Sequence, residues 1–159
     1  MRPNKLDYYL EIAEVVGKRS SCIHEECGAI IVRGSGNGSI VSTGYKGAPM
    51  YRHHCEELDQ CSVETHLHDI QMCRAVPAEV NAIMSCSPEE RYNSIMYISR
   101  KIYREDGTFY YQPPSGFCKR ILLNSGIRAV AFRNEKGDPE FKDVSRFIND
   151  DETLVEESL

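Results

Sequence analysis

The chain has 159 residues, which suits a single domain, and its hydrophobic (41%) and charged (27%) fractions are ordinary for a globular protein. Its formal net charge of −5 gives no general basic surface, so we expect no duplex nucleic-acid partner, although a local basic pocket for one nucleotide stays open. No apolar run approaches the roughly 20 residues that span a bilayer, and the first residues lead into an amphipathic segment. We therefore expect a cytoplasmic protein with no membrane partner.

The first part of the chain predicts a helix followed by a hairpin. Apolar residues recur at helical spacing over residues 6–17, where a glycine can end the helix. The apolar, β-branched run 28–32 suits a buried strand. Three glycines in 34–38 predict a turn, and 40–44 then forms the return strand.

Helices and strands alternate in the rest of the chain. After an irregular stretch over 45–74, a helix is expected over 77–84, with its proline in the first turn. A strand is expected over 95–98, a second helix over 116–124 and a further strand over 129–132. This alternation predicts an α/β layered domain.

Two further segments have distinct compositions. Residues 100–112 are polar and aromatic, with Asp106-Gly107 as a turn signal. Residues 149–159 form an acidic tail that we expect to be solvated and partly frayed. The domain is therefore predicted to cover 1–148.

Seven cysteines are many for a chain of this length. Their odd number, in a chain with no signal core, disfavours a disulfide framework, and several stand near histidines, which indicates metal binding. For Cys27 and Cys86 we expect the ordinary role of small buried apolar residues.

Three stretches carry the residue types of a functional centre. Residues 73–83 contain Glu79 in the first turn of a helix, residues 114–118 end in Cys118 at the start of the next helix, and residues 43–49 form a glycine-containing loop. In zinc deaminases, a His-x-Glu segment and a Pro-Cys-x-x-Cys segment open two facing helices. One ligand from the first and two from the second make three corners of a tetrahedron, and water takes the fourth. The metal lowers the pKa of that water toward about 7, and the glutamate moves protons.

This sequence resembles the deoxycytidylate (dCMP) deaminases over most of its length. Segments that match the family follow one another in its order: 1–32, 44–49, 73–83, 96–99 and 125–127. The resemblance implies a three-layer α-β-α cytidine-deaminase-like fold with a central mixed sheet. It also implies a pyrimidine deoxynucleotide as ligand and self-association into a homo-oligomer. Relative to the family, residues 100–112 are an inserted segment.

The chain departs from the family at the zinc ligands. Pro77 stands in place of the zinc-binding histidine and Ser115 in place of the first cysteine of the second motif, whereas Glu79 and Cys118 remain. Proline offers no lone pair, serine is a poor zinc ligand, and one thiolate cannot hold a catalytic zinc. We therefore expect a nucleotide-binding protein in which zinc-dependent hydrolytic deamination is lost.

Individual residues keep two interpretations each. Glu79 is either a pocket acid or an acid favoured by the helix dipole, and Cys118 is either a buried apolar residue or a nucleophile with a depressed pKa. Lys46, which replaces an asparagine of the family, is a solvated charge or a contact for phosphate or carboxylate. Asn81 is a pocket or packing amide, and Ser115 is expected to cap its helix.

A structural metal site is implied by the resemblance, because some members of the family carry a structural zinc beside the catalytic one. Cys22, Cys55 and Cys73 stand at the matching places, and His68 or His66 can complete four ligands. A closed Cys₃His set is a structural type and would tether the long irregular loop. The alternative is that these thiols bind no metal.

Two other functions stay open. The first is an active enzyme, either a dCMP deaminase or another pyrimidine-nucleotide enzyme, whose rebuilt centre uses Glu79 and Cys118. The second is an assembly role as a subunit of an oligomer.

Overall fold

The computed structural model describes residues 1–34, 38–151 and 154 and shows one mixed sheet. Its strands lie in the order β2-β1-β3-β5-β6, and β4 pairs with the end of β3. Strands β3 and β5 are parallel, and all other neighbours are antiparallel. The strands are β1 (Glu25–Val32), β2 (Ile40–Tyr45), β3 (Ile95–Tyr103), β4 (Phe109–Tyr111), β5 (Ala129–Arg133) and β6 (Pro139–Asp143).

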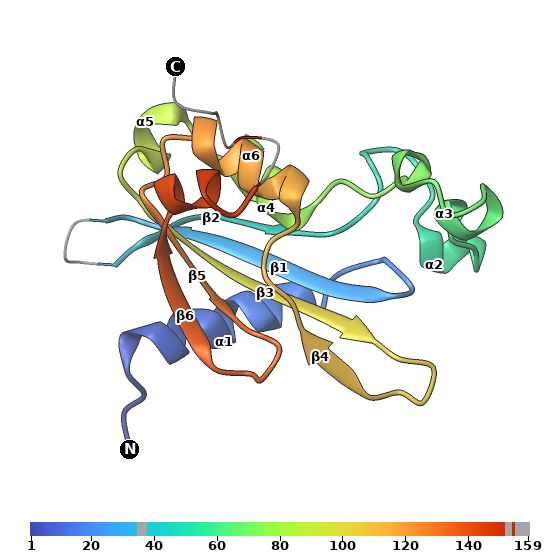
Figure 1. The fold of residues 1–159 in the computed structure, drawn as a ribbon, viewed down its shortest axis with the longest axis horizontal. Helices are drawn as coiled ribbons and strands as arrows, with labels where there is room; N and C mark the ends of the chain where they lie inside the picture. Colours follow the sequence, from blue (N-terminus) through green and yellow to red (C-terminus); the bar gives the residue numbers. More distant parts are fainter. Residues whose placement is uncertain (35–37, 152–153, 155–159) are drawn as a thin grey trace.

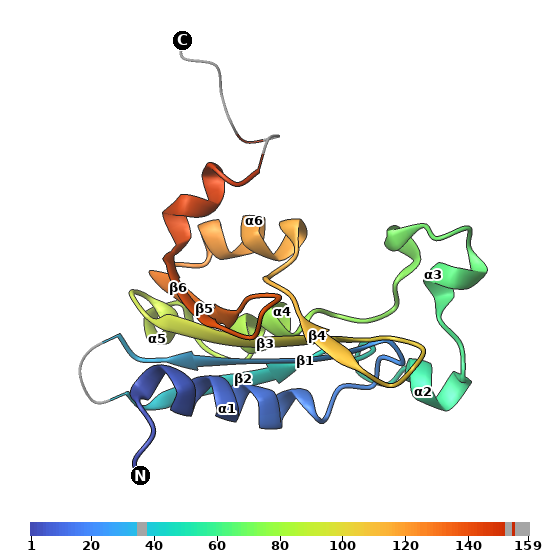
Figure 2. The ribbon, with the colours of Figure 1, turned by 60° about the horizontal axis from the view of Figure 1, so that its bottom comes forward.

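Helices cover both faces of the sheet. Helix α1 lies on one face, and α4 and α6 lie on the other, as Figures 1 and 2 show. This arrangement confirms the predicted three-layer α-β-α fold with a central mixed sheet. The helices are α1 (Lys5–Gly17), α2 (Cys55–Leu58), α3 (Ser62–Thr65), α4 (Ala78–Met84), α5 (Pro88–Arg91) and α6 (Gly116–Asn124), with the 3-10 turns η1 (Ile70–Met72) and η2 (Val144–Ile148).

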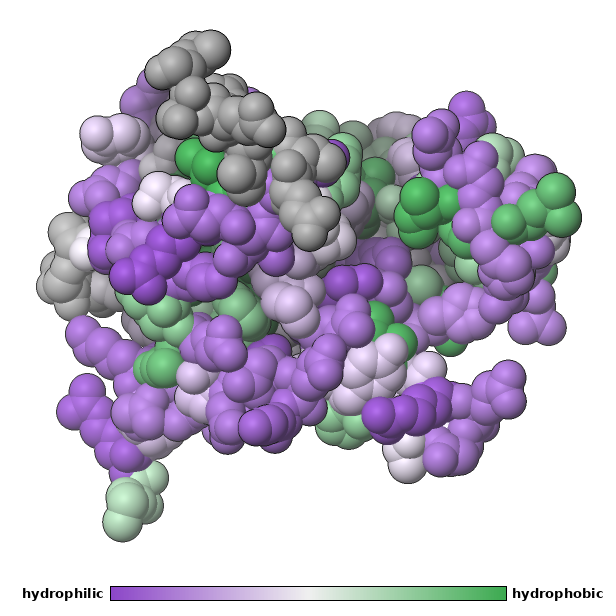
Figure 3. Space-filling model, viewed as in Figure 1, coloured by the Kyte–Doolittle hydropathy of each residue, from purple (hydrophilic) through white to green (hydrophobic). Residues whose placement is uncertain are grey.

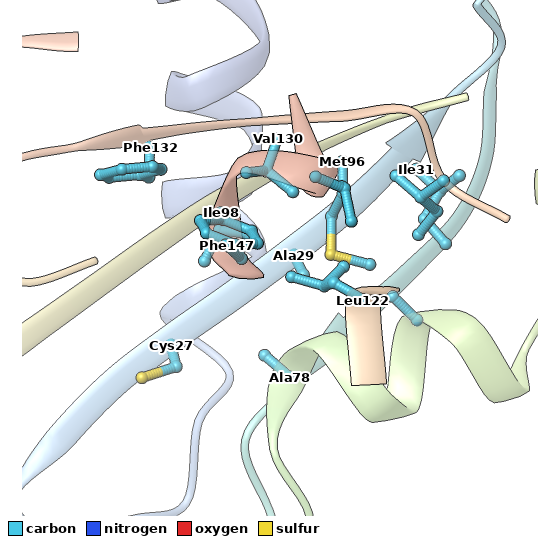
Figure 4. Packing of buried hydrophobic residues seen from close by; sticks show 13 residues of the cluster. Cys27, Ala29, Ile31, Ala78, Met96, Ile98, Leu122, Val130, Phe132 and Phe147 are labelled. Atoms are coloured by element: carbon cyan, nitrogen blue, oxygen red, sulfur yellow. The ribbon is translucent and has the colours of Figure 1, made fainter. Parts of the chain in front are cut away.

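Strand β1 is buried on both faces, which explains why its sequence is almost continuously apolar. Ile30 and Val32 pack with α1, whereas Ala29 and Ile31 pack with α4, α6 and η2. Figure 4 shows this second cluster, in which Cys27 lies near the start of α4. The central sheet is therefore the rigid support for everything that projects from the strand ends.

Two glycines allow the helices to lie close to the sheet. A Cβ atom at Gly28 would stand 2.1 Å from the carbonyl oxygen of Ala13 in α1. One at Gly44 would stand 2.4 Å from both the carbonyl oxygen of Ala78 and the nitrogen of Ala82 in α4. No side chain fits in either place, so Gly44 fixes the start of α4 against the end of β2.

Most predicted elements are confirmed. The helix over 116–124 agrees with α6 residue for residue, and the helix over 6–17 agrees with α1. The strand expected over 95–98 continues to 103, since it pairs there with β1 and β4. Helix α5 and strand β6 were not predicted.

Residues 100–112, which we expect to be an insertion, cover the end of β3 and the whole of β4, and these strands form a hairpin around a turn at Gly107. Lys101 forms an ion pair with Glu14 of α1, and the Tyr111 hydroxyl donates to the same carboxylate at 3.2 Å. The hairpin therefore packs on α1.

Parts of two other predictions lie outside the described residues, namely 35–37 of the expected turn and 152–153 and 155–159 of the acidic tail. Among the described residues, no helix is long and apolar enough to cross a membrane. The face shown in Figure 3 is mainly hydrophilic, and apolar atoms gather on the projecting segment that carries α2 and α3.

Candidate functional site

A cleft of about 830 Å³ lies where the first turns of α4 and α6 face the sheet, at the start of β1 and the end of β2. Segment 70–76 and Phe117 form further parts of its wall. Its apolar lining includes Ile70, Val80 and Ile121. Its polar and ionisable lining includes Glu25, Lys46, Arg74, Glu79, Arg100 and Cys118.

Glu79 lies in the first turn of α4 and is only 5% exposed. Burial raises the pKa of its carboxyl above the ordinary value, although its own backbone N–H and the Cys118 thiol, which donate to it, act in the opposite direction. Helix position alone would lower this pKa, so loss of solvent dominates. Glu79 therefore lies in a pocket, which agrees with the interpretation of this residue as a pocket acid.

Cys118 is 2% exposed and begins the buried face of α6. Burial, followed by the nearby Glu79 carboxylate, raises the pKa of its thiol to about 12. The hypothesis of a nucleophile with a depressed pKa is therefore wrong for this environment, because the helix start does not offset desolvation. Cys118 behaves as a buried, protonated residue whose thiol donates to Glu79.

Ser115 caps α6, as predicted. Its hydroxyl oxygen accepts a hydrogen bond from the backbone N–H of Cys118 at 3.3 Å. Asn81 donates from its side-chain nitrogen to the carbonyl oxygen of Tyr45 at 2.9 Å, which ties α4 to the end of β2. Among the described residues, Asn81 is not part of the cleft lining, so the structure supports its packing role.

Lys46 belongs to a buried charge cluster. The carboxylate of Glu25 accepts from Lys46 Nζ at 2.9 Å and from Arg100 Nη2 at 3.0 Å. Burial would raise the pKa of Glu25, but the two cations outweigh it and bring the pKa to about 2. Burial likewise opposes the charge on Lys46, yet Glu25 raises the pKa of this amine above its usual range. All three groups are charged at neutral pH.

Sequence analysis missed Glu25, Arg74 and Arg100 in the cleft. The Nε atom of Arg74 is buried and has no hydrogen-bond partner among the described residues. Arg74 lies close enough to Cys55 to influence its thiol, whereas Arg100 lies close to Glu79 and Cys118. Arg74 is thus the cation near the Cys55 thiol, and Arg100 is the cation near the Cys118 thiol.

The residues of the cleft do not fit a catalytic zinc. Pro77 is the N-cap of α4 and has no donor atom to offer. The hydroxyl of Ser115 is engaged in the helix cap, so Cys118 is the one zinc ligand that remains at these motif positions. Among the residues that the structure describes, no group of metal-ligating side chains close enough for one ion includes Glu79 or Cys118.

The predicted structural-metal residues come together only in part. Cys55 is buried at the start of α2, and burial followed by the thiols of Cys22, Cys73 and Cys61 raises its pKa. His68 is exposed and has a left-handed backbone conformation. Among the described residues, it belongs to no group of ligand atoms close enough together to hold one metal ion. The thiols of Cys22, Cys73 and Cys61 are near enough to Cys55 to affect its pKa, but among the described residues Cys22, Cys55 and Cys73 do not form a group whose ligand atoms all lie within 4.8 Å.

No family model matches the chain. It is 27% identical to the deoxycytidylate deaminase of Mycobacterium phage D29, over 84% of this chain and 98% of that protein. It is 31% identical to the deoxycytidylate deaminase of Schizosaccharomyces pombe, over 60% of this chain but only 30% of that protein.

Solved structures show the same fold. The dCMP deaminase of the cyanophage S-TIM5 superposes with a TM-score of 0.59 at 24% identity, over 84% of this chain and 86% of that one. A second structure of the same protein, in complex with dCMP and dUMP, has a TM-score of 0.58. The cytidine deaminase of Mycobacterium leprae has a TM-score of 0.51 at 14% identity, over 91% and 97% of the two chains.

Proposed function

We infer that this dCMP-deaminase-family protein, which has a cytidine-deaminase-like fold, binds a pyrimidine deoxynucleotide in the cleft without zinc-dependent hydrolysis of the base. The observation that carries the proposal is a positively charged cleft in a chain whose formal net charge is −5.

The charge of the cleft follows from its side chains. Lys46, Arg74 and Arg100 are cations, and Glu25 is the one carboxylate among the described lining residues whose pKa lies below its ordinary value. Such a surplus of positive charge, in a partly desolvated site, favours a phosphate group. The free Nε–H of Arg74 is a donor ready for that phosphate.

The rest of the cleft suits a pyrimidine ring. Phe117, Ile121 and Val80 supply apolar surface, and Glu79 stands at the buried end. A neutral carboxyl both donates and accepts a hydrogen bond, which matches the polar edge of a pyrimidine. The S-TIM5 deaminase of the same fold has been solved with dCMP and dUMP, which supports this class of ligand.

Hydrolysis is lost in this proposal because the cleft lacks the ligands that would hold a catalytic zinc. With Pro77 and Ser115 at the two ligand positions, nothing in the cleft generates hydroxide at neutral pH. The residues that remain bind and orient a nucleotide, and burial raises the pKa of the Glu79 carboxyl above its ordinary value.

Calorimetric titration with dCMP, dCTP and dTTP tests this proposal, with dAMP as the purine control. We expect binding heat with at least one pyrimidine nucleotide, weaker or no heat with dAMP, and no ammonia release. Absence of heat with all three pyrimidine nucleotides would contradict the proposal.

A second function, catalysis by a rebuilt centre, is favoured by one observation. The raised pKa of Glu79 is a property of general acids that work near neutral pH. Ammonia release from dCMP that disappears in Glu79→Gln would support this function, and its absence in the unmodified chain would exclude deamination.

We also propose a structural zinc at Cys22, Cys55 and Cys73, with a fourth ligand from segment 61–68, where His68 was predicted. The proximity of these thiols and the burial of Cys55 support it. Three thiolates give a tight zinc site that ties segment 55–73 to the sheet. Protein purified without chelator should contain zinc, and Cys55→Ser should lower the zinc content.

The remaining expectations are proposals of the same kind. We propose that 1–148 forms one domain with 100–112 as its insertion, and that the protein self-associates in the cytoplasm. Sedimentation that shows only monomers would contradict the self-association.

A further inference from the structure

Three metal-ligating side chains meet at a place that neither the cleft nor the predicted thiol set explains. The ligand atoms of His24, Cys61 and Glu64 all lie within 4.8 Å of one another. We propose that these three residues form a second metal site, which takes a divalent cation of the zinc class.

The distances fit such an ion. Zinc bonds of about 2.0 to 2.3 Å to nitrogen, oxygen and sulfur place tetrahedral ligand atoms roughly 3.3 to 3.8 Å apart. Small side-chain rotations bring the three atoms to that spacing. One imidazole, one thiolate and one carboxylate are a donor set that suits zinc, and water can take the fourth position.

The contact between His24 and Glu64 is not an ordinary hydrogen bond. His24 Nε2 lies 2.8 Å from Glu64 Oε1, yet this buried nitrogen has no aligned hydrogen-bond partner among the described residues. An imidazole N–H aimed at the carboxylate would form a hydrogen bond at this distance. The Nε2 atom of His24 is therefore a buried polar atom left without a hydrogen bond, close to a carboxylate oxygen that can share a metal ion with it.

The backbone holds the ligands in place. Cys61 is the N-cap of α3 and Glu64 lies three residues later, so both side chains project from the same side of one turn. His24 directly precedes β1, and its carbonyl oxygen accepts from the backbone N–H of Tyr103 at 3.0 Å. A bound ion would thus fasten α3 to the ends of β1 and β3.

Assigning Cys61 to this site separates it from the thiol set. Cys61 also lies near Cys55, so one shared zinc held by four cysteines is the competing arrangement. In the arrangement proposed, the two sites fill independently, and His24 and Glu64 matter for only one of them.

Native mass spectrometry after loading with Zn²⁺ alone tests the assignment. We expect His24→Ala and Glu64→Gln each to lower the zinc count by one per chain. The matched controls His53→Ala and Glu56→Gln, which change exposed residues in or next to α2, should leave the count unchanged. An unchanged count in His24→Ala and Glu64→Gln would overturn the proposal.

A second pair of variants separates this site from the proposed structural zinc. Cys22→Ser/Cys73→Ser should still bind one zinc, and adding His24→Ala should remove it. Loss of all zinc from the folded double variant would place Cys61 in the thiol set and overturn the proposal.

Titration of the unmodified chain and of His24→Ala with Co²⁺ gives a measurement that does not depend on the folding of the double variant. We expect one cobalt-thiolate absorption step to be lost in His24→Ala. Identical titration spectra would contradict the site, and neither result depends on nucleotide binding.

Discussion

The cleft and the projecting segment 55–73 differ in their supply of metal ligands. At the cleft, Pro77 and Ser115 provide no usable metal ligand, and of the motif positions only Cys118, which is buried, keeps one. On the projecting segment and the turn before β1, the ligand atoms of one thiol, one imidazole and one carboxylate (Cys61, His24 and Glu64) lie within 4.8 Å of one another. Among the described residues, the cleft thus lacks a set of metal ligands, whereas the projecting segment and the turn before β1 offer one.

We infer from this difference that ligand binding in the cleft depends on charged side chains that the fold holds in place. Glu25 holds Lys46 and Arg100 side by side next to Glu79, so a permanent positive charge lies in the cleft without any ion. Four substitutions test the contrast between the two regions.

Restoring the ligands at the cleft should have the largest effect. The double variant Pro77→His/Ser115→Cys adds an imidazole and a thiol beside Cys118, and the extended backbone at residue 77 accepts any residue. We expect one additional zinc per chain and ammonia release from dCMP that rises from none to a measurable rate. With Pro77→Ala/Ser115→Ala as control, a folded restored variant that gains no zinc would contradict our account of the cleft.

Removing the charge of Glu25 should cost the most stability. Glu25→Gln leaves two largely buried cations without their counter-ion, which should lower the free energy of unfolding by about 3 kcal/mol. Urea unfolding measures the loss. The control Glu26→Gln, whose carboxylate accepts only from the Tyr103 hydroxyl at the surface, should change little.

The same residue predicts an acid dependence. Because the pKa of Glu25 falls from 4.5 to about 2 on folding, its stabilisation is complete above pH 4.5 and is lost as the pH falls toward about 2. Glu25→Gln should therefore be less sensitive to pH across this window, and equal sensitivity of the two proteins would contradict the charge cluster.

Truncating Arg74 should weaken nucleotide binding. Arg74→Ala removes a donor whose Nε atom has no partner within the described part of the chain, so we expect a loss of about 10- to 100-fold in affinity for dCMP. Calorimetry measures this, with exposed Arg52→Ala as the control. Equal affinities in the two variants would move the phosphate site away from Arg74.

Loss of the α6 cap should have the smallest effect. Ser115→Ala removes the acceptor for the Cys118 N–H and should destabilise the protein by about 1 kcal/mol in thermal unfolding. Ser85→Ala, which removes an exposed hydroxyl that only donates to the Asn81 carbonyl, is the matched control. A larger change in nucleotide affinity than in stability would give Ser115 a role beyond the cap.

The fold was largely predictable because its signals are local. Ser115 at the start of α6 and Gly126 after its end define that helix in the sequence itself, and the structure agrees. The full length of β3 was not predictable, because residues beyond Ile98 extend only through their pairing with β1 and β4.

The site was predictable only at the positions that its motifs mark. Glu79 and Cys118 were found from their motifs, but Glu25 and Arg100 lie 75 residues apart and meet only through the β1–β3 register. Charged residues beside predicted strands were the available signal. The motif left Cys118 open between a buried residue and a nucleophile, because the depth of burial, which raises its pKa, is a tertiary property.

The central claim is that the cleft binds a pyrimidine deoxynucleotide but does not deaminate it. The most direct test measures ammonia release and binding heat with dCMP on one sample of the unmodified chain whose zinc content has been determined. The account predicts binding heat, no ammonia and no metal bonded to the Cys118 sulfur in an anomalous-scattering map. Ammonia release together with a metal ion on that sulfur would contradict it.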